Sequence, residues 1–250
     1  MFRTIAAALA ATALFTASAR CQLLYASSFE TPNYHVGQSI DGIDNWFSFI
    51  SPNANQIVNG FSTASLGRRA VRCWGGDPNL QTTGGILDGA WARNASINPA
   101  YAANALVHVQ CNVRLDGPDT GAGPNDDLVS ANLGARNGVG GSVSMFLSST
   151  GDVYCFAGSV NGATNYAFQT PVQLGHYATL GITLNYRTHM ATFWVNYHAV
   201  GTAPFGGQAN EAFNGAWIEF AAYDNPLYVD PSLYTGYFDN LLVFAAPTCH

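Results

Sequence analysis

The stretch HYATLGITLNYRTHMATFWVNYHAVGTAP, from His176 to Pro204, decides the fold. Before its polar break, Arg187-Thr188-His189, apolar or small residues recur at every second position. They are Ala178, Leu180, Ile182, Leu184 and Tyr186. After the break the same alternation resumes with Ala191, Phe193, Val195 and Tyr197. Side chains of a strand point alternately to its two faces, so this pattern predicts an antiparallel hairpin with one buried face.

The composition is that of a globular β protein. Apolar residues make up 48% of the 250 residues and charged residues only 10%, which is enough for a core and argues against disorder. The 26 glycines suit many short strands joined by tight turns. All nine basic residues are arginines and the net charge is −6, so a phosphate-binding surface for nucleic acid is not expected.

Further segments alternate in the same way, and no helical periodicity follows the N-terminal segment. The expected strands are Leu23–Phe29, Ala105–Leu115, Leu128–Ala135, Ser142–Ser148, Asp152–Ala157, Ala216–Tyr223 and the closing GYFDNLLVFA from Gly236 to Ala245. Strands with short turns between them predict an all-β antiparallel sandwich of two sheets. Nothing indicates an internal boundary, so residues 20–250 are expected to form one domain.

The N-terminus, MFRTIAAALAATALFTASARC, has the organisation of a secretory signal peptide. Arg3 precedes an apolar run from Ile5 to Phe15, and Ala17-Ser18-Ala19 forms a small-residue cleavage site. We expect residues 1–19 to be removed and the protein to be secreted, as an extracellular or periplasmic protein. Lipid anchoring at Cys21 is the alternative, but Arg20 stands where a lipobox needs a small residue. No apolar run reaches the length of a membrane span.

Three motifs carry a resemblance to a known fold. They are the opening FETPNYHVGQSIDGIDNW from Phe29 to Trp46, the segment Trp194-Val195-Asn196, and Tyr237-Phe238-Asp239-Asn240. Their order resembles the concanavalin A-like, laminin-G-like jelly-roll domains of secreted bacterial proteins. The chain departs from that pattern at Asn45 and Tyr197, where the family usually has glycine. The resemblance implies a two-sheet jelly roll and recognition of carbohydrate.

The Ala105–Leu115 strand offers a candidate site. Its polar face presents His108, Gln110, Asn112 and Arg114 in a row opposite the valines. By the resemblance, such a row on the concave sheet would hold a glycan. Histidine, amide and arginine are also the side chains with which a lyase abstracts a proton and neutralises a uronate. The alternative is that any half-solvated antiparallel strand has a polar face.

Trp194 interrupts the polar face of its strand between Thr192 and Asn196. An outward aromatic ring offers a flat apolar surface for a sugar ring, while polar neighbours such as Asn196 bond the hydroxyls. Three other rings are placed similarly, Phe146, Tyr154 and Phe156. The alternative is that loops cover these rings and bury them in a secondary core.

Two places could bind a structural Ca²⁺, and the sequence indicates no other cofactor. By the resemblance, Glu30 of the opening motif and Asp239 of the closing motif would be ligands, and carboxylate oxygens suit calcium. Both side chains could equally bond backbone groups at strand ends. The second place is the loop Leu115–Asp127, which carries Asp116, Asp119, Asp126 and Asp127. Aspartate and glycine are also ordinary turn residues, so this loop needs no metal.

The five cysteines divide into two groups. Cys73, Cys111 and Cys155 alternate in register with apolar neighbours and are expected to be buried as small hydrophobes. Cys21 and Cys249 lie just outside the first and last strands, which are neighbours in the jelly rolls that the chain resembles. The resemblance therefore implies a Cys21–Cys249 disulfide, and export permits one.

The function expected from these observations is that of a non-catalytic, lectin-like domain whose partner is an extracellular polysaccharide or glycan. One alternative is a polysaccharide lyase or glycoside hydrolase on the same fold, with His108 and Arg114 as the reactive pair. Another is a structural or adhesive exoprotein without a small ligand. Retaining hydrolysis is disfavoured, because glutamates are few and the possible pair Glu219 and Asp224 has no distinctive spacing.

Overall fold

The computed structural model describes twelve segments of the chain. They are residues 22–30, 32–48, 55–60, 68–74, 86–93, 105–118, 129–137, 141–159, 162–168, 170–206, 213–223 and 233–247. Across these segments the chain forms fifteen β-strands, and every strand pairing is antiparallel. The predicted all-β class is confirmed.

The first sheet has eight strands. Along the sheet their order is β13 (His198–Pro204), β12 (Met190–Val195), β11 (Ala178–Asn185), β6 (Ala105–Asp116), β15 (Thr235–Pro247), β4 (Arg69–Trp74) and β3 (Asn55–Asn59). The eighth strand, β1 (Gln22–Ser27), also pairs with β15. The first and last strands of the described chain are therefore neighbours in one sheet.

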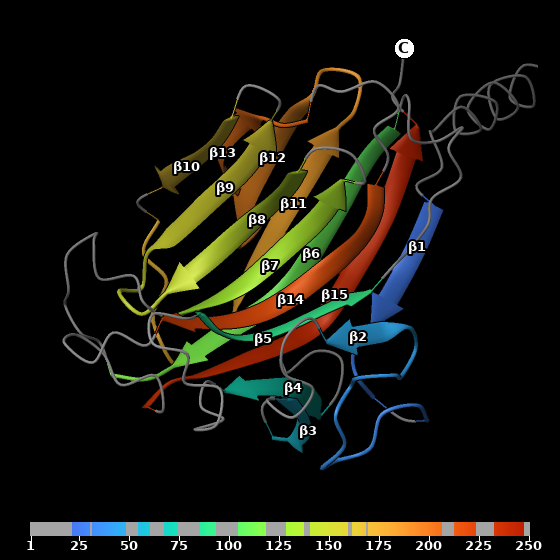
Figure 1. The fold of residues 1–250 in the computed structure, drawn as a ribbon, viewed down its shortest axis with the longest axis vertical. Coiled ribbons are helices and arrows are strands. Elements are labelled where there is room, and N and C mark those ends of the chain that lie inside the picture. Colours follow the sequence, from blue (N-terminus) through green and yellow to red (C-terminus); the bar gives the residue numbers. More distant parts are fainter. Residues whose placement is uncertain are drawn as a thin grey trace, which may run out of the picture.

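The second sheet has seven strands. Their order is β10 (Gly162–Phe168), β9 (Val153–Ser159), β8 (Gly141–Ser148), β7 (Val129–Asn137), β14 (Phe213–Tyr223), β5 (Ile86–Arg93) and β2 (Trp46–Ser48). Figure 1 shows β7, β8, β9 and β14 in a layer over β6, β11, β12 and β15. Two stacked antiparallel sheets make the jelly-roll sandwich that the sequence predicted.

The core fills the space between the sheets, because each strand turns alternate residues inward. On β6, Val107, Val109, Cys111, Val113 and Leu115 are all fully buried. On the facing sheet, β7, β8 and β14 contribute Leu133, Met145, Leu147, Ile218 and Phe220 to the same cluster. The outward-facing residues of the strands do not take part in this core.

The hairpin predicted within His176–Pro204 consists of β11 and β12, paired from Leu180 opposite Val195 to Asn185 opposite Met190. One expectation about it is wrong. The alternation placed Tyr197 on the buried face, but Tyr197 lies in the turn to β13 and is 71% exposed. The pairing ends at Val195, so the period-two pattern no longer governs residue 197.

The N-terminal opening motif packs as an aromatic group against the end of the sandwich. Trp46 is buried and meets Tyr25 edge-on, with ring centroids 6.4 Å apart. The Trp46 indole N–H donates to the Tyr25 hydroxyl over 3.2 Å, and the Tyr25 and Tyr34 hydroxyls lie 3.3 Å apart. The motif therefore has a packing role, which its resemblance to other jelly rolls does not itself reveal.

Some expectations concern residues that the structure does not describe. The signal peptide, residues 1–19, lies outside the described segments, as do Cys21 and Cys249. Gln22 pairs with Ala245, so the premise of a disulfide between neighbouring strands is met, and the bridge itself stays a prediction. The described residues contain no helix with the length and apolar character needed to cross a bilayer.

The three remaining cysteines are buried free thiols, as predicted. Burial raises the pKa of the Cys73, Cys111 and Cys155 thiols well above the ordinary value. Because the thiolate is the reactive form, these groups resist both oxidation and alkylation in the folded protein.

Titration of thiols with a chromogenic disulfide reagent tests this assignment and the disulfide together. In the native mature protein we expect Cys73, Cys111 and Cys155 to remain unreactive. After denaturation without reductant, three thiols should react if Cys21 and Cys249 are bridged. Five reactive thiols would contradict the bridge, and rapid native labelling of Cys111 would contradict its burial.

Candidate functional site

The polar row of β6 lies where the sequence predicted, on the outward face of the eight-stranded sheet. His108, Gln110, Asn112 and Arg114 are partly exposed and alternate with fully buried residues. The four side chains do not form one site, however. They extend along the strand, and consecutive members are about 7 Å apart because each is two residues from the next.

A shallow cavity of about 180 Å³ lies at one end of this row. We call it the Trp194 cavity. Its lining comprises His108, Gln110, Thr179, Gly181, Trp194 and Tyr197. The structure thus brings together three of the predicted residues, His108, Gln110 and Trp194, from β6 and β12. The intervening strand β11 supplies Thr179 and Gly181 between them.

A chain of hydrogen bonds fixes the polar side chains of the cavity. The Trp194 indole N–H donates to the Thr183 hydroxyl oxygen over 2.9 Å. The same hydroxyl lies 2.7 Å from His108 Nδ1, and His108 Nε2 lies 3.2 Å from Gln110 Oε1. Since the Gln110 amide oxygen can only accept, Nε2 is assigned as the protonated nitrogen, and Nδ1 of the neutral ring then accepts from the Thr183 hydroxyl.

Both ring nitrogens of His108 therefore have hydrogen-bond partners within the protein. Burial lowers its pKa, and the hydrogen bond to Gln110 opposes that shift only in part. The ring also stacks on Phe244 of β15, with centroids 4.8 Å apart. Because Gln110 uses its oxygen to accept from His108, its amide nitrogen keeps two N–H donors for other partners.

Gly181 forms the base of the cavity, opposite both Trp194 and Gln110. A Cβ atom there would lie 3.3 Å from His108 Cε1 and 3.3 Å from Trp194 Cβ, which is tighter than ordinary contact. The indole starts opposite Gly181 and reaches Thr183, so it extends along β11 over the sheet. The absence of a side chain at residue 181 permits that placement.

The turn between β12 and β13 places the last lining residue. Asn196 and Tyr197 have φ angles of 49° and 66°, in the left-handed region that two-residue hairpin turns require. The Asn196 amide oxygen accepts from the Thr179 backbone N–H over 2.9 Å, and the Asn196 N–H donates to the Thr179 carbonyl over 2.8 Å. Asn196, predicted as a ligand-binding residue, fastens the turn to β11 through these two bonds.

Tyr197 is in an unfavourable conformation for its residue type. A left-handed φ is easy for glycine, tolerable for asparagine and costly for a residue with a large side chain, by about 1–2 kcal/mol. Asn45, the other departure from the family pattern, also has a positive φ of 63° but is of the tolerant type. The turn therefore keeps a strained, exposed aromatic side chain at the rim of the cavity.

Asn112 and Arg114 lie outside the cavity. The Thr179 hydroxyl donates to Asn112 Oδ1 over 2.8 Å, so Asn112 helps to position a lining residue. The Arg114 guanidinium donates from Nε and Nη2 to the two oxygens of Asp116, over 2.6 and 2.8 Å. It also lies over the Tyr237 ring, 5.5 Å from the centroid. Hydrogen bonding to Asp116 raises the pKa of Arg114, so its charge is permanent.

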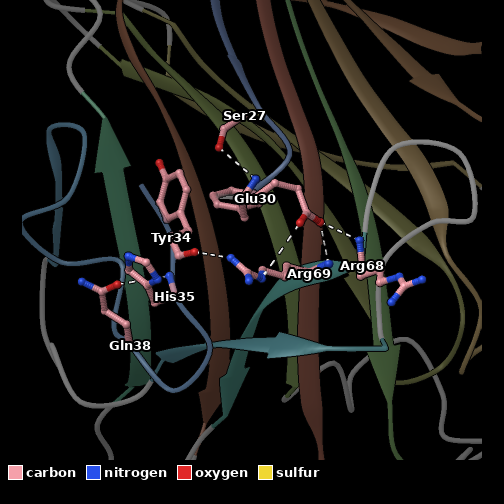
Figure 2. Close-up of polar contacts among 8 residues, drawn as sticks. Ser27, Glu30, Tyr34, His35, Gln38, Arg68 and Arg69 are labelled. Carbon is pink, nitrogen blue, oxygen red and sulfur yellow. Dashed lines mark hydrogen bonds and ion pairs between the residues drawn. The ribbon is translucent and has the colours of Figure 1, made fainter. Parts of the chain in front are cut away.

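Glu30, one of the two predicted calcium ligands, bonds the chain near β4. Its Oε1 accepts from the backbone N–H groups of Arg68 and Arg69, over 2.6 and 2.7 Å, as Figure 2 shows. The Arg69 guanidinium lies 4.0 Å from Oε2 and also donates to the Tyr34 carbonyl. This carboxylate therefore ties the opening motif to the start of β4 through protein donors.

Asp239, the second predicted ligand, is 1% exposed at a bulge of β15. Its Oδ1 accepts from the Asn240 backbone N–H over 2.7 Å. No three His, Cys, Asp or Glu side chains gather at one point in the described segments. The two carboxylates thus fit a calcium site only if backbone oxygens complete it. Calcium there stays a prediction, which a fall in Tm on adding EDTA would support and an unchanged Tm would contradict.

Of the four aspartates in the predicted acidic loop, the structure describes only Asp116, the partner of Arg114. Asp119, Asp126 and Asp127 lie outside the described segments. A second cavity, of about 590 Å³, lies beside Asp116 at the β8–β9 turn. Its lining is Gly117, Thr150, Gly151 and residues 171–174, none of which was predicted as a site residue.

The seven-stranded sheet holds the remaining candidates. Phe146, Tyr154 and Phe156 are partly exposed on its outward face, as the alternation predicted. Glu219 on β14 accepts from the Asn132 amide over 2.7 Å. Its possible partner, Asp224, lies outside the described segments.

Sequence reasoning missed four residues of the Trp194 cavity or its network: Thr179, Gly181, Thr183 and Tyr197. Thr179, Gly181 and Thr183 lie on the polar face of β11, a strand that the sequence predicted. Their closeness to His108 depends on the register between β6 and β11. The signal for Tyr197 was present, because it replaces a glycine of the family pattern in a turn.

Comparison with known proteins supports the fold. No protein-family model and no curated protein matches the sequence. Among solved structures, the marine alginate lyase of Aplysia kurodai is similar, with a TM-score of 0.60 and 13% identity over 88% of this chain and 98% of that one. The CBM2 module of the evolved Dit protein of Lactobacillus casei BL23 phage J-1 gives 0.55 and 10%, over 93% and 99%.

A third similar structure is the binding domain of Paraclostridial Mosquitocidal Protein 1, with a TM-score of 0.55 and 11% identity over 91% of this chain. The chain spans only half the length of that structure. At such low identities the three likenesses show a shared fold, and they confirm the predicted concanavalin-like jelly-roll sandwich.

The lowered pKa of His108 predicts a pH dependence of stability. Above pH 6.5 the imidazole is neutral in both states, whereas below it the unfolded chain takes up a proton that the folded chain resists. We expect the free energy of unfolding to fall as the pH drops below 6.5, with a limiting slope of about 1.4 kcal/mol per pH unit. Urea melts of wild type and His108→Gln between pH 8 and 5.5 check this. Parallel curves for the two proteins would contradict it.

Proposed function

We propose that this chain is an exported, non-catalytic carbohydrate-binding domain that holds a sugar ring in the Trp194 cavity. The observation that carries the proposal is the pairing of two aromatic rings, Trp194 and Tyr197, with an amide and a hydroxyl around one open hollow. Sugar rings have apolar faces and polar edges, and this lining has a counterpart for each.

The size of the cavity favours one ring of a longer polymer. At about 180 Å³ it is smaller than the roughly 300–1,000 Å³ pockets that enclose drug-sized ligands. A shallow hollow on an open sheet face can hold one unit of a chain that continues on both sides. An extracellular polysaccharide is therefore a better partner than a free monosaccharide, and the signal-like N-terminus agrees with export.

Binding is favoured over lyase chemistry by the positions of the proposed reactive pair. His108 and Arg114 are six residues apart on one strand, which separates them by about 20 Å, too far for both to act on one sugar unit. Both ring nitrogens of His108 already have hydrogen-bond partners within the protein. A general base needs an available nitrogen within hydrogen-bond reach of the proton that it removes.

Hydrolysis is disfavoured on similar grounds. A glycosidase places two carboxyl groups on opposite sides of the scissile bond, roughly 5–9.5 Å apart. None of the residues lining the Trp194 cavity is an aspartate or a glutamate. The similarity of the chain to an alginate lyase therefore supports a fold that suits polysaccharides, without giving this site the groups for catalysis.

Replacement of Trp194 tests the proposal directly. Binding of the mature protein to a glycan array and to insoluble polysaccharides should weaken by at least about 30-fold in Trp194→Ala, as expected for a central aromatic contact. Trp194→Phe keeps a ring but loses the bond to Thr183, so it should retain part of the affinity. Both variants are compared at temperatures where their melts show a folded protein.

Two outcomes would contradict the proposal. Equal binding by wild type and a folded Trp194→Ala variant would place any glycan site elsewhere. Failure of wild type to bind any glycan would favour the structural or adhesive exoprotein. Release of unsaturated uronates from a polysaccharide panel would instead establish a lyase.

Tyr197 gives a second test, in which stability and binding should change in opposite directions. Tyr197→Gly removes the left-handed strain and should raise the free energy of unfolding by about 1 kcal/mol. It also removes a stacking surface and should weaken glycan binding by about tenfold. The control Tyr197→Phe keeps the ring and the strain, so neither quantity should change much. A glycine variant that binds as well as wild type would show that the ring has no binding role.

A further inference from the structure

A second group of side chains lies on the same outward face as the Trp194 cavity. In the register of the eight-stranded sheet, Tyr237 of β15 pairs with Arg72 of β4 on one side and with Arg114 of β6 on the other. Directly paired residues of neighbouring strands point to the same face. On this face of the sheet, one arginine therefore lies on each side of Tyr237. We call Arg72, Tyr237 and Arg114 the arginine row.

Arg72 and Arg114 differ in how their charges are compensated. Arg114 forms a two-bond ion pair with Asp116, whose oxygens accept over 2.6 and 2.8 Å. Arg72 has no ion pair with any carboxylate of the described segments. Its guanidinium carbon lies 4.9 Å from the centroid of the Trp74 ring, and its Nε is buried without a hydrogen-bond partner.

A guanidinium without an ion pair among the described residues is a candidate binding group for an external anion. The buried Nε of Arg72 is out of reach of a ligand on the surface, so the donors left for an anion are the two terminal nitrogens of the guanidinium. The Trp74 ring holds the planar head in place, and a held guanidinium loses less freedom when it binds an anion. Of the two positive charges in the row, Asp116 neutralises that of Arg114, so the charge left without an ion pair in the described segments is that of Arg72.

The position of the row relates it to the Trp194 cavity. Gln110 of the cavity and Arg114 of the row are four residues apart on β6, which corresponds to about 13 Å along the strand. Arg72 lies two strand spacings to the side, roughly 10 Å further across the sheet. A polymer with one ring in the cavity can therefore extend over the same face to the row, with Asn112 between them.

We propose that Arg72 is the centre of an anion-binding subsite, and that the glycan held at the Trp194 cavity is an acidic one. The anionic group is a carboxylate or a sulfate ester on a sugar, both of which match the two-pronged donor of a guanidinium. Asp116 opposes an anion near Arg114, so the neighbouring Arg72 is the principal contact. This inference rests on the proposed carbohydrate-binding function.

The experiment compares matched polymers. Affinity electrophoresis of the mature protein is run with a polyuronate, with the same polymer after reduction of its carboxyl groups, and with a sulfated polysaccharide. Migration of the wild-type protein should be retarded more strongly by one of the two acidic polymers than by the neutral one. The difference in retardation should shrink as salt is added. Which acidic gel retards the protein identifies carboxylate or sulfate as the group bound.

Variants assign the effect to Arg72. Arg72→Gln should reduce affinity for the acidic polymer by about tenfold while binding to the neutral one is unchanged. The control Arg187→Gln removes the same charge at an exposed turn on another part of the chain and should have no such effect. If Arg72→Gln melts too low for use, Arg72→Lys keeps the charge without the fork and should lose part of the preference.

The outcomes separate this inference from the function on which it rests. If wild type binds the acidic and the reduced polymers equally well and Trp194→Ala still loses binding, the anion subsite is overturned. The proposed carbohydrate-binding function then stands. An acidic preference that is the same in Arg72→Gln and in Arg187→Gln assigns it to overall charge and also overturns the subsite. No binding to any of the polymers overturns both.

Discussion

The pairing of β6 on both of its edges is the interaction on which the rest of the structure depends. β11 holds one edge from Leu106 to Val113, and β15 holds the other from Ala105 to Asp116. With both edges fixed, the strand cannot slip by one residue without exchanging its buried and outward faces. The five buried residues from Val107 to Leu115 fix that choice, so the outward residues His108 to Arg114 keep constant positions on the surface.

The local part of this arrangement could be predicted from the sequence, because alternation is a property of one strand at a time. The β11–β12 hairpin, the polar face of β6 and the buried thiols were all predicted in this way. The Trp194 cavity could be predicted only in part. Its network joins His108 to Thr183, 75 residues away, through a register that no local pattern specifies. Tyr197 was misplaced because a turn interrupts the alternation just before it.

The same limit applies to the hydrogen bonds that the predicted ligands make within the protein. Asn196 has the chemistry of a sugar-binding amide, but its oxygen accepts from the Thr179 backbone. Glu30 has the chemistry of a calcium ligand, but its Oε1 accepts from two backbone N–H groups near β4. Residue type indicates what a side chain can bond, whereas the fold determines which partner is nearest. Arg72 became a candidate only when the register showed it beside Tyr237.

Gly181 and Trp194 share one space, and this has a consequence for how the sequence can change over time. A Cβ at residue 181 would lie 3.3 Å from both Trp194 Cβ and His108 Cε1, so a larger residue there requires these two neighbours to shift. The two positions are therefore expected to covary among descendants of this chain. Lineages that keep Trp194 and His108 in their present positions should keep the glycine between them.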